Sequence, residues 1–158
     1  MADPAETLIA RLRKRGWTLA TCESLTGGML GATLTAVPGA STVYRGGLIT
    51  YVSDLKATLA QVDSTWIARH GVVNERTAAQ MAEGARRSCG AHWGIATTGV
   101  AGPTTQDGEP VGTVWIGLAG PGEEPCAQRY LFEGDRAAIR LATVDAALAL
   151  VLEVSGRE

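Results

Sequence analysis

Apolar residues recur along the chain at helical and at strand spacing in turn. An apolar stripe at every third or fourth position predicts a first helix between Asp3 and Gly16. Short apolar runs predict strands at 17–22, 43–52, 92–97, 112–119 and 126–132. Further helical patterns predict helices at 29–36, from 54, around 66, at 74–89 and from 135 to about 154.

This alternation predicts an α/β fold: a three-layer α/β/α sandwich around a mixed, mostly parallel sheet of about five strands. The turn at 120–122 is too short for a crossover, so the last two strands form an antiparallel hairpin. Residues 1–158 show no linker or repeat, and we expect one domain. The final helix is apolar nearly all round, so it either has a wide core stripe or also meets a second subunit in a homo-oligomer.

The composition of the chain limits the kinds of partner that the protein is expected to bind. A net charge of −2 argues against a general nucleic-acid binder, which needs an excess of clustered basic residues. The uncharged stretch 24–44 is rich in glycine and hydroxyl residues and contains Pro38, so it does not predict a membrane helix. Cys22, Cys89 and Cys126 are widely spaced, which predicts no metal site and suits a reducing compartment. We therefore expect a cytoplasmic protein without a metal, a membrane partner or a nucleic-acid partner.

The first candidate chemistry lies at Glu23–Gly28, between a predicted strand and a helix. A serine on such a turn presents its hydroxyl at the edge of a sheet, and the N–H groups of residues 25–28 can hold an oxyanion there. Ser24 is therefore a candidate nucleophile. The alternative is an ordinary helix cap.

A serine nucleophile needs a base. His70 and His92 have no local polar partner, whereas Lys56 follows an apolar strand. Lysine, unlike arginine, loses its proton when it is desolvated, so Lys56 is the candidate base. The alternative is a surface lysine in the first turn of a helix. Tyr51 either orients the lysine or relays its proton, or simply packs across strands with a solvated hydroxyl.

A second candidate segment is Thr97–Pro103, at the end of another predicted strand. Backbone N–H groups of such a loop can hold a phosphate or a carboxamide. The segment matches neither the Walker A pattern nor the dinucleotide glycine motif. The alternative is a glycine-rich surface turn.

Seven short motifs occur in order along nearly the whole chain. They read CESLTGG at 22–28, VPGAS at 37–41, YVSDLK at 51–56, GVVN at 71–74, TGVAGP at 98–103, PVGTVWI at 110–116 and FEGDR at 132–136. Together they resemble the CinA carboxy-terminal domain family, whose characterised activity is nicotinamide-nucleotide amidase.

The resemblance implies a three-layer α/β/α fold and hydrolysis of nicotinamide mononucleotide to nicotinate mononucleotide and ammonia, without a cofactor. It places the catalytic serine, tyrosine and lysine on Ser24, Tyr51 and Lys56, and further pocket residues on Ser41 and Thr98. The full set of expected substrate contacts is Glu23, Thr26, Gly27, Gly28, Ser41, Arg45, Thr98 and Gly99.

The chain departs from the family pattern at three places. Leu25 stands where the family has cysteine, Ser53 stands where it has asparagine, and residues 104–107 replace a glycine-rich run. These changes leave Ser24 and Lys56 in place but alter the loop expected to hold the ribose phosphate. Two alternatives therefore stay open: a non-catalytic nucleotide-binding or regulatory module of the same fold, and an amidase for another small carboxamide.

Overall fold

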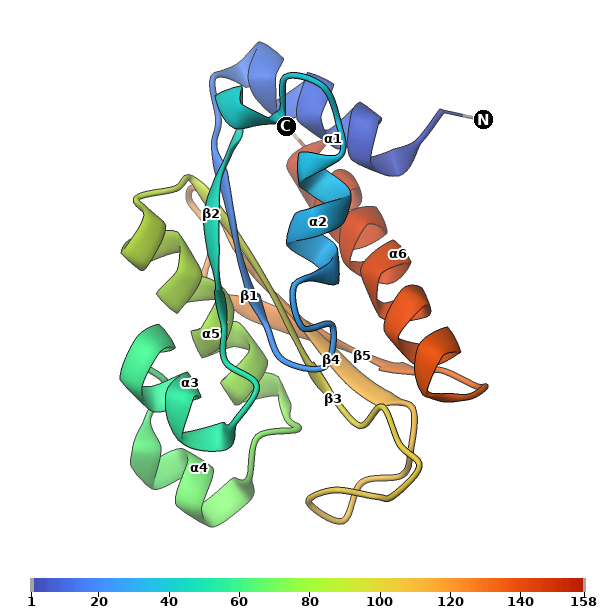
Figure 1. Ribbon diagram of the computed structural model, residues 1–158. Coiled ribbons are helices and arrows are strands. Elements are labelled where there is room, and N and C mark those ends of the chain that lie inside the picture. The colour runs from blue at the N-terminus through green and yellow to red at the C-terminus, as the bar shows by residue number, and fades with distance from the viewer. Residues whose placement is uncertain (1, 158) are drawn as a thin grey trace.

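The computed structural model of the protein describes residues 2–157, which form a five-stranded sheet between helices (Figure 1). The strands are β1 (Leu19–Glu23), β2 (Tyr44–Ile49), β3 (Trp93–Gly99), β4 (Thr113–Ala119) and β5 (Cys126–Leu131), in the order β2-β1-β3-β4-β5. β1 pairs in parallel with β2 and β3, whereas β4 runs antiparallel to β3 and β5. Four of these strands thus point one way and β4 is reversed, which confirms the predicted mixed sheet and its final hairpin.

Helices cover both faces of the sheet. One face carries α1 (Pro4–Arg15), α2 (Met29–Thr35) and α6 (Arg136–Ser155), and the other carries α3 (Ser53–Ala60), α4 (Ser64–His70) and α5 (Glu75–Cys89) (Figure 1). A short 3₁₀ turn, η1 (Ala40–Thr42), precedes β2. The three-layer α/β/α sandwich is confirmed.

Each side of the sheet has its own apolar core. Leu8 of α1 and Val144 of α6 belong to the larger core, with Ile95 from β3. The smaller core includes Cys22 of β1 and Met81 of α5. Every residue of β1 is buried, because helices cover the strand on both faces. The burial of β1 fixes the position of the serine that follows it.

Glycines let α5 lie directly on the strands. A Cβ atom at Gly94 of β3 would lie 2.1 Å from the carbonyl oxygen of Ala82, and one at Gly117 of β4 would lie 2.0 Å from that of Ala78. Any side chain at either position would push the helix away from the sheet. Some of the many glycines therefore allow the backbone of α5 to lie close to the backbones of β3 and β4.

The predicted helix caps are present. The side chain of Asp3 accepts a hydrogen bond from the N–H of Ala5, Asn74 caps α5, and Asp135 caps α6. β2 ends at Ile49, three residues before the predicted end, because residues 50–52 leave the sheet to enter α3.

The final helix buries Ile139, Leu148 and Val151 against the sheet side, while Leu141 stays exposed. A contact of its outer face with a second subunit stays a prediction. No helix within residues 2–157 has the length and the apolar content needed to cross a membrane.

Candidate active site

The carboxyl ends of β1, β2 and β3 meet at one edge of the sheet, because these strands are parallel neighbours. A cavity of about 490 Å³ opens at this edge, which is the lower end of the molecule in Figure 1. Its lining comes from the segments that follow the three strands, from loop residues 104–106, and from Val72 and Arg136. Ser24, Tyr51 and Thr98 are therefore brought to one cavity, as the sequence predicts.

The hydroxyl of Ser24 lies against the amine of Lys56. Ser24 follows β1 directly, and Lys56 lies in the first turn of α3, directly after the segment that leaves β2. The Nζ atom of Lys56 is 3.0 Å from Oγ of Ser24 and 2.6 Å from the carbonyl oxygen of Thr50. Ser24 is 8% exposed in the cavity wall, whereas Lys56 is only 1% exposed. The amine of Lys56 thus contacts the serine hydroxyl from the protein interior, on the side away from the cavity.

Burial lowers the pKa of Lys56 from 10.5 to about 8, because an ammonium ion loses its hydration there. The Asp107 carboxylate, and the Cys22 thiol once it ionises at high pH, act in the opposite direction and are the smaller influences. The neutral amine is consequently accessible near neutral pH, and only a neutral amine can accept the proton of a serine hydroxyl.

The nearest thiol does not compete for this role. Cys22 is fully buried, and its Sγ atom lies 3.5 Å from the hydroxyl of Thr50. Burial raises the pKa of the Cys22 thiol to about 11, so the thiol stays protonated near neutral pH.

Glu23 is buried beneath the turn and holds the start of α2. Its carboxylate accepts hydrogen bonds from the N–H groups of Gly28, Leu30 and Gly31 and from the hydroxyl of Thr26. These contacts satisfy the free amides of the helix N-terminus with a charged acceptor. The structure therefore gives Glu23 a scaffold position and not a place in the cavity lining.

Not all N–H groups of residues 25–28 are free to bind an oxyanion. Gly27 donates its N–H to the carbonyl of Ser24, and Gly28 donates to Glu23. The N–H groups of Leu25 and Thr26 find no acceptor anywhere in residues 2–157, and Leu25 lines the cavity. Thr26 is fully buried and lies outside the cavity lining, so the amide of Leu25 is the one left to bind an oxyanion.

Three other features keep this turn in place. The hydroxyl of Thr26 is buried and lies 2.8 Å from that of Thr97. From α6, Arg140 donates to the carbonyl oxygens of Leu25 and Thr26. Gly27 and Gly28 have φ values of 57° and 109°, which few other residues adopt. Thr26, Gly27 and Gly28 thus shape the turn, and none of them lines the cavity.

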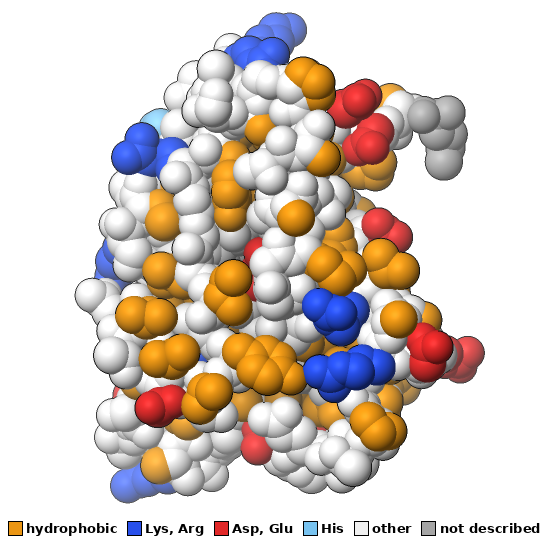
Figure 2. All heavy atoms as spheres, in the orientation of Figure 1, with side chains coloured by type: hydrophobic (Ala, Val, Ile, Leu, Met, Phe, Trp, Pro, Cys, Tyr) orange, Lys and Arg blue, Asp and Glu red, His pale blue; other side chains and the backbone are white. Residues whose placement is uncertain are grey.

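Tyr51 stands at the cavity mouth and is 57% exposed. Its hydroxyl accepts a hydrogen bond of 2.9 Å from Arg136 and makes none with Lys56. The expectation that Tyr51 orients the lysine does not match this geometry, because the carbonyl of Thr50 holds the amine instead. Hydrophobic side chains gather over this part of β2 and α3 in Figure 2, with basic side chains beside them toward α6.

The structure separates two expected substrate contacts from the cavity. Ser41 is exposed in η1, and Arg45 donates to the carbonyl oxygen of Cys89 at the C-terminal end of α5. Both lie at the amino-terminal end of β2, whereas Ser24 follows the carboxyl end of its parallel neighbour β1. Within one chain, Ser41 and Arg45 therefore lie at the opposite edge of the sheet from Ser24, and their expected contact with the substrate stays a prediction.

Thr98 and Gly99 do line the cavity. The hydroxyl of Thr98 is buried and donates a 2.8 Å hydrogen bond to the carbonyl oxygen of Val72. It thereby ties the end of β3 to the connection between α4 and α5.

Residues that sequence reasoning did not select complete the site. Arg136 donates to Tyr51 and, at 2.6 Å, to the carbonyl of Gly102. Arg136 lies in the FEGDR motif, so the motif carried a signal for it. The contributions of Thr50 and Arg140 depend on backbone carbonyl oxygens, which no residue pattern reveals. Within residues 2–157, no three side chains of His, Cys, Asp or Glu lie close enough together to hold a metal ion.

Comparison with known protein families assigns the chain to a family. Residues 1–155 match the family model described as the CinA C-terminal domain. The chain belongs to the CinA C-terminal domain family. The predicted family resemblance is thus confirmed.

Proteins that are similar in sequence to this chain are also CinA-like. A CinA-like protein from Frankia casuarinae is 48% identical over 144 residues, which cover 91% of this chain and 33% of that protein. A CinA-like protein from Parasynechococcus marenigrum is 44% identical over 146 residues, which cover 91% of this chain and 35% of that protein. The chain therefore spans about a third of the length of these CinA relatives.

Solved CinA structures share the whole fold. A CinA superfamily protein from Escherichia coli superposes with a TM-score of 0.92 at 32% identity, over 98% of this chain and 93% of that chain. A competence/damage inducible protein from Agrobacterium tumefaciens superposes with a TM-score of 0.88 at 31% identity, over 98% of each chain.

Proposed function

We propose that this chain is an amidase that hydrolyses the carboxamide of nicotinamide mononucleotide to nicotinate mononucleotide and ammonia. Ser24 is the nucleophile and Lys56 the base. The observation that carries the proposal is the 3.0 Å contact between a cavity-wall hydroxyl and a buried amine. A Ser-Lys pair of this kind performs acyl transfer on several unrelated folds.

In the first half of the reaction, neutral Lys56 takes the proton of Ser24 as Oγ bonds to the carboxamide carbon. The negative charge that develops on the carboxamide oxygen is stabilised by the N–H group of Leu25, which lines the cavity and has no other acceptor within residues 2–157. When the carbon–nitrogen bond breaks, the Lys56 ammonium returns its proton to the leaving nitrogen. Ammonia departs and an ester on Ser24 remains.

In the second half, the same lysine activates water. Lys56 takes a proton from a water molecule, whose oxygen attacks the ester carbon, and then returns the proton to Oγ of Ser24. The acid product leaves and the enzyme is restored. The carbonyl of Thr50 holds the amine in place throughout, because it accepts from Nζ without competing for the proton.

Two features support a nucleotide as the substrate. The cavity of about 490 Å³ is in the size range of small-molecule sites. Arg136 gives the lining a guanidinium group, which pairs well with a phosphate. The choice of the nicotinamide nucleotide itself rests on the family resemblance of the motifs around Ser24, Tyr51 and Lys56.

The test is ammonia release from nicotinamide mononucleotide by wild type and by Ser24→Ala, with binding of the nucleotide measured in parallel. The proposal predicts release by wild type only and binding by both proteins. Binding without release by wild type would support the non-catalytic nucleotide-binding module instead. Release from other small carboxamides but not from the nucleotide would keep the chemistry and replace the substrate.

A further inference from the structure

The carboxylate of Asp107 fastens the cavity loop to a distant part of the chain. Its Oδ2 atom accepts hydrogen bonds from the backbone N–H groups of Val72, at 2.7 Å, and Val73, at 3.2 Å. Val72 and Val73 lie in the connection between α4 and α5, more than thirty positions away in the sequence. One carboxylate oxygen thus joins two segments that both line or flank the cavity.

The loop around Asp107 is built to present this side chain. Residues 106–109 form a tight turn, in which the N–H of Glu109 donates 2.8 Å to the carbonyl of Gln106. Asp107 and Gly108 have φ values of 54° and 74°, the conformation for which an Asp-Gly pair is favoured. The approach is close, because a Cβ atom at Gly71 would lie 2.4 Å from Oδ2 of Asp107.

The segment that Asp107 holds is also held from the opposite direction. Thr98 donates to the carbonyl oxygen of Val72, while Asp107 accepts from the N–H of the same residue. Val72, Thr98 and loop residues 104–106 all line the cavity that contains Ser24. Other hydrogen bonds hold the loop near its base, where Val100 donates to Thr113 and Gly112 donates to Val100, and at Gly102, which accepts from Arg136. Among the hydrogen bonds of residues 2–157, those of Asp107 tie the far part of the loop to the α4–α5 connection.

We propose that Asp107 is a positioning residue that sets the substrate-binding wall of the cavity by fastening loop 104–106 to the α4–α5 connection. The proposal rests on the amidase function proposed above and concerns the part of the substrate beyond the reacting carboxamide. Asp107 makes no hydrogen bond with Ser24 or Lys56, so its loss leaves the geometry of the pair unchanged. The loss of this contact therefore falls mainly on binding. Because the Asp107 charge also raises the pKa of Lys56 slightly, kcat is compared at a pH well above 8, where the amine is neutral in every variant.

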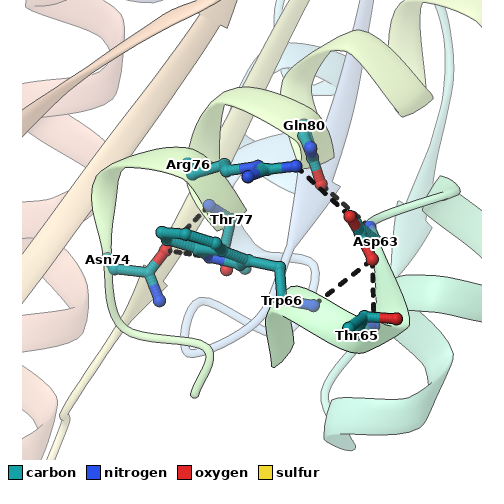
Figure 3. A network of polar contacts seen from close by, with 7 residues as sticks. All are labelled: Asp63, Thr65, Trp66, Asn74, Arg76, Thr77 and Gln80. Carbon is teal, nitrogen blue, oxygen red and sulfur yellow. Dashed lines mark hydrogen bonds and ion pairs between the residues drawn. The ribbon is translucent and has the colours of Figure 1, made fainter. Parts of the chain in front are cut away.

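The chain offers a matched control. Asp63 also accepts from two backbone N–H groups through one oxygen, those of Thr65 at 2.9 Å and Trp66 at 3.3 Å (Figure 3). It caps α4 and does not line the cavity. Asp63→Ala removes the same kind of contact as Asp107→Ala, but away from the proposed substrate.

The experiment compares KM and kcat for nicotinamide mononucleotide in wild type, Asp107→Ala, Asp107→Asn and Asp63→Ala. Asp107→Ala is expected to raise KM about tenfold or more while kcat stays within about threefold. A tenfold change is the size expected when a charge-assisted hydrogen bond is lost. Asp107→Asn keeps an acceptor oxygen and tolerates the positive φ, so it recovers most of the affinity. Asp63→Ala keeps the wild-type KM.

Nucleotide binding to Ser24→Ala and to Ser24→Ala/Asp107→Ala supplies a readout without turnover. A tenfold weaker dissociation constant in the double variant supports the role of Asp107. Unchanged KM and binding in Asp107→Ala, or an equal loss in Asp63→Ala, would overturn it while leaving the amidase intact. Absence of ammonia release by wild type would instead overturn the amidase function, and weaker binding in the double variant would then still support the positioning role.

Discussion

The amine of Lys56 lies 3.0 Å from the hydroxyl of Ser24, although 32 positions separate the two residues in the sequence. The contact exists because β1 and β2 are parallel neighbours whose carboxyl ends meet at one edge. Ser24 leaves β1 at this edge, and α3 carries Lys56 back toward it from β2. The fold thus brings a hydroxyl to the cavity wall and a dehydrated amine directly behind it.

The pH dependence of the reaction follows from the pKa of this amine. Burial lowers the pKa of Lys56 to about 8, and the base must be neutral to act. We expect kcat/KM for the nucleotide to rise with pH and to level off above an apparent pKa of about 8. A rate that is flat from pH 6 to pH 10 would contradict the base role of Lys56.

The buried lysine also reduces the stability of the fold. The folded state binds this proton more weakly than the unfolded chain does, so folding is penalised at every pH at which the unfolded lysine is charged. The penalty, about 3 kcal/mol from the change in pKa, is complete below pH 8 and disappears between pH 8 and 10.5. Lys56→Met should therefore raise the free energy of unfolding at pH 7 by about 1–3 kcal/mol.

Urea unfolding of wild type and Lys56→Met at pH 7 and pH 10.5 measures this difference. The advantage of the variant should shrink as the pH rises, because at pH 10.5 the folded wild-type amine is neutral and the unfolded one is only half protonated, which leaves little of the penalty. A variant less stable than wild type at pH 7 would show that the hydrogen bonds of Lys56 outweigh its desolvation.

The carboxylate of Glu23 should matter for folding more than for catalysis. Glu23→Ala leaves the buried N–H groups of Leu30 and Gly31 and the half-buried N–H of Gly28 without their acceptor, while the Thr26 hydroxyl keeps Thr97 as its partner. We expect the free energy of unfolding to fall by about 3 kcal/mol or more. Glu153→Ala is the control, since this exposed carboxylate only pairs with Arg157 and should change stability by less than about 1 kcal/mol.

Residues at the cavity edge of the sheet should affect substrate binding, and residues at the opposite edge should not. Arg136 lines the cavity, whereas Ser41 and Arg45 lie at the far edge. Steady-state kinetics should show KM raised about tenfold or more in Arg136→Ala, with little change in Ser41→Ala and Arg45→Ala. A loss of activity in Ser41→Ala comparable to that in Arg136→Ala would mean that a second chain brings the far edge to the cavity.

Much of the fold could be predicted from the sequence because its elements have strong local signals. Asp3, Asn74 and Asp135 are good caps at the starts of apolar periodic segments, and all three cap helices. The hairpin of β4 and β5 followed from one short turn. The pairing of β2 with β1 is non-local, and no residue pattern in either strand specifies it.

The candidate site was harder to predict than the fold. Ser24 and Lys56 belong to motifs, so their selection needed no three-dimensional information. The role of Glu23 depends on which N–H groups the helix start leaves free, and that of Tyr51 depends on the partner of its hydroxyl. Ser41 lies in a motif too, but its distance from Ser24 depends on the direction of β2, which the motif does not contain.

The most direct test of the Ser24–Lys56 pair is ammonia release from nicotinamide mononucleotide by wild type and by Lys56→Arg, with thermal unfolding of both proteins as the check on folding. A guanidinium group stays protonated at working pH and cannot accept the serine proton. We expect folded Lys56→Arg to lose about three orders of magnitude in rate or more. A folded variant that retains a rate close to that of wild type would contradict it.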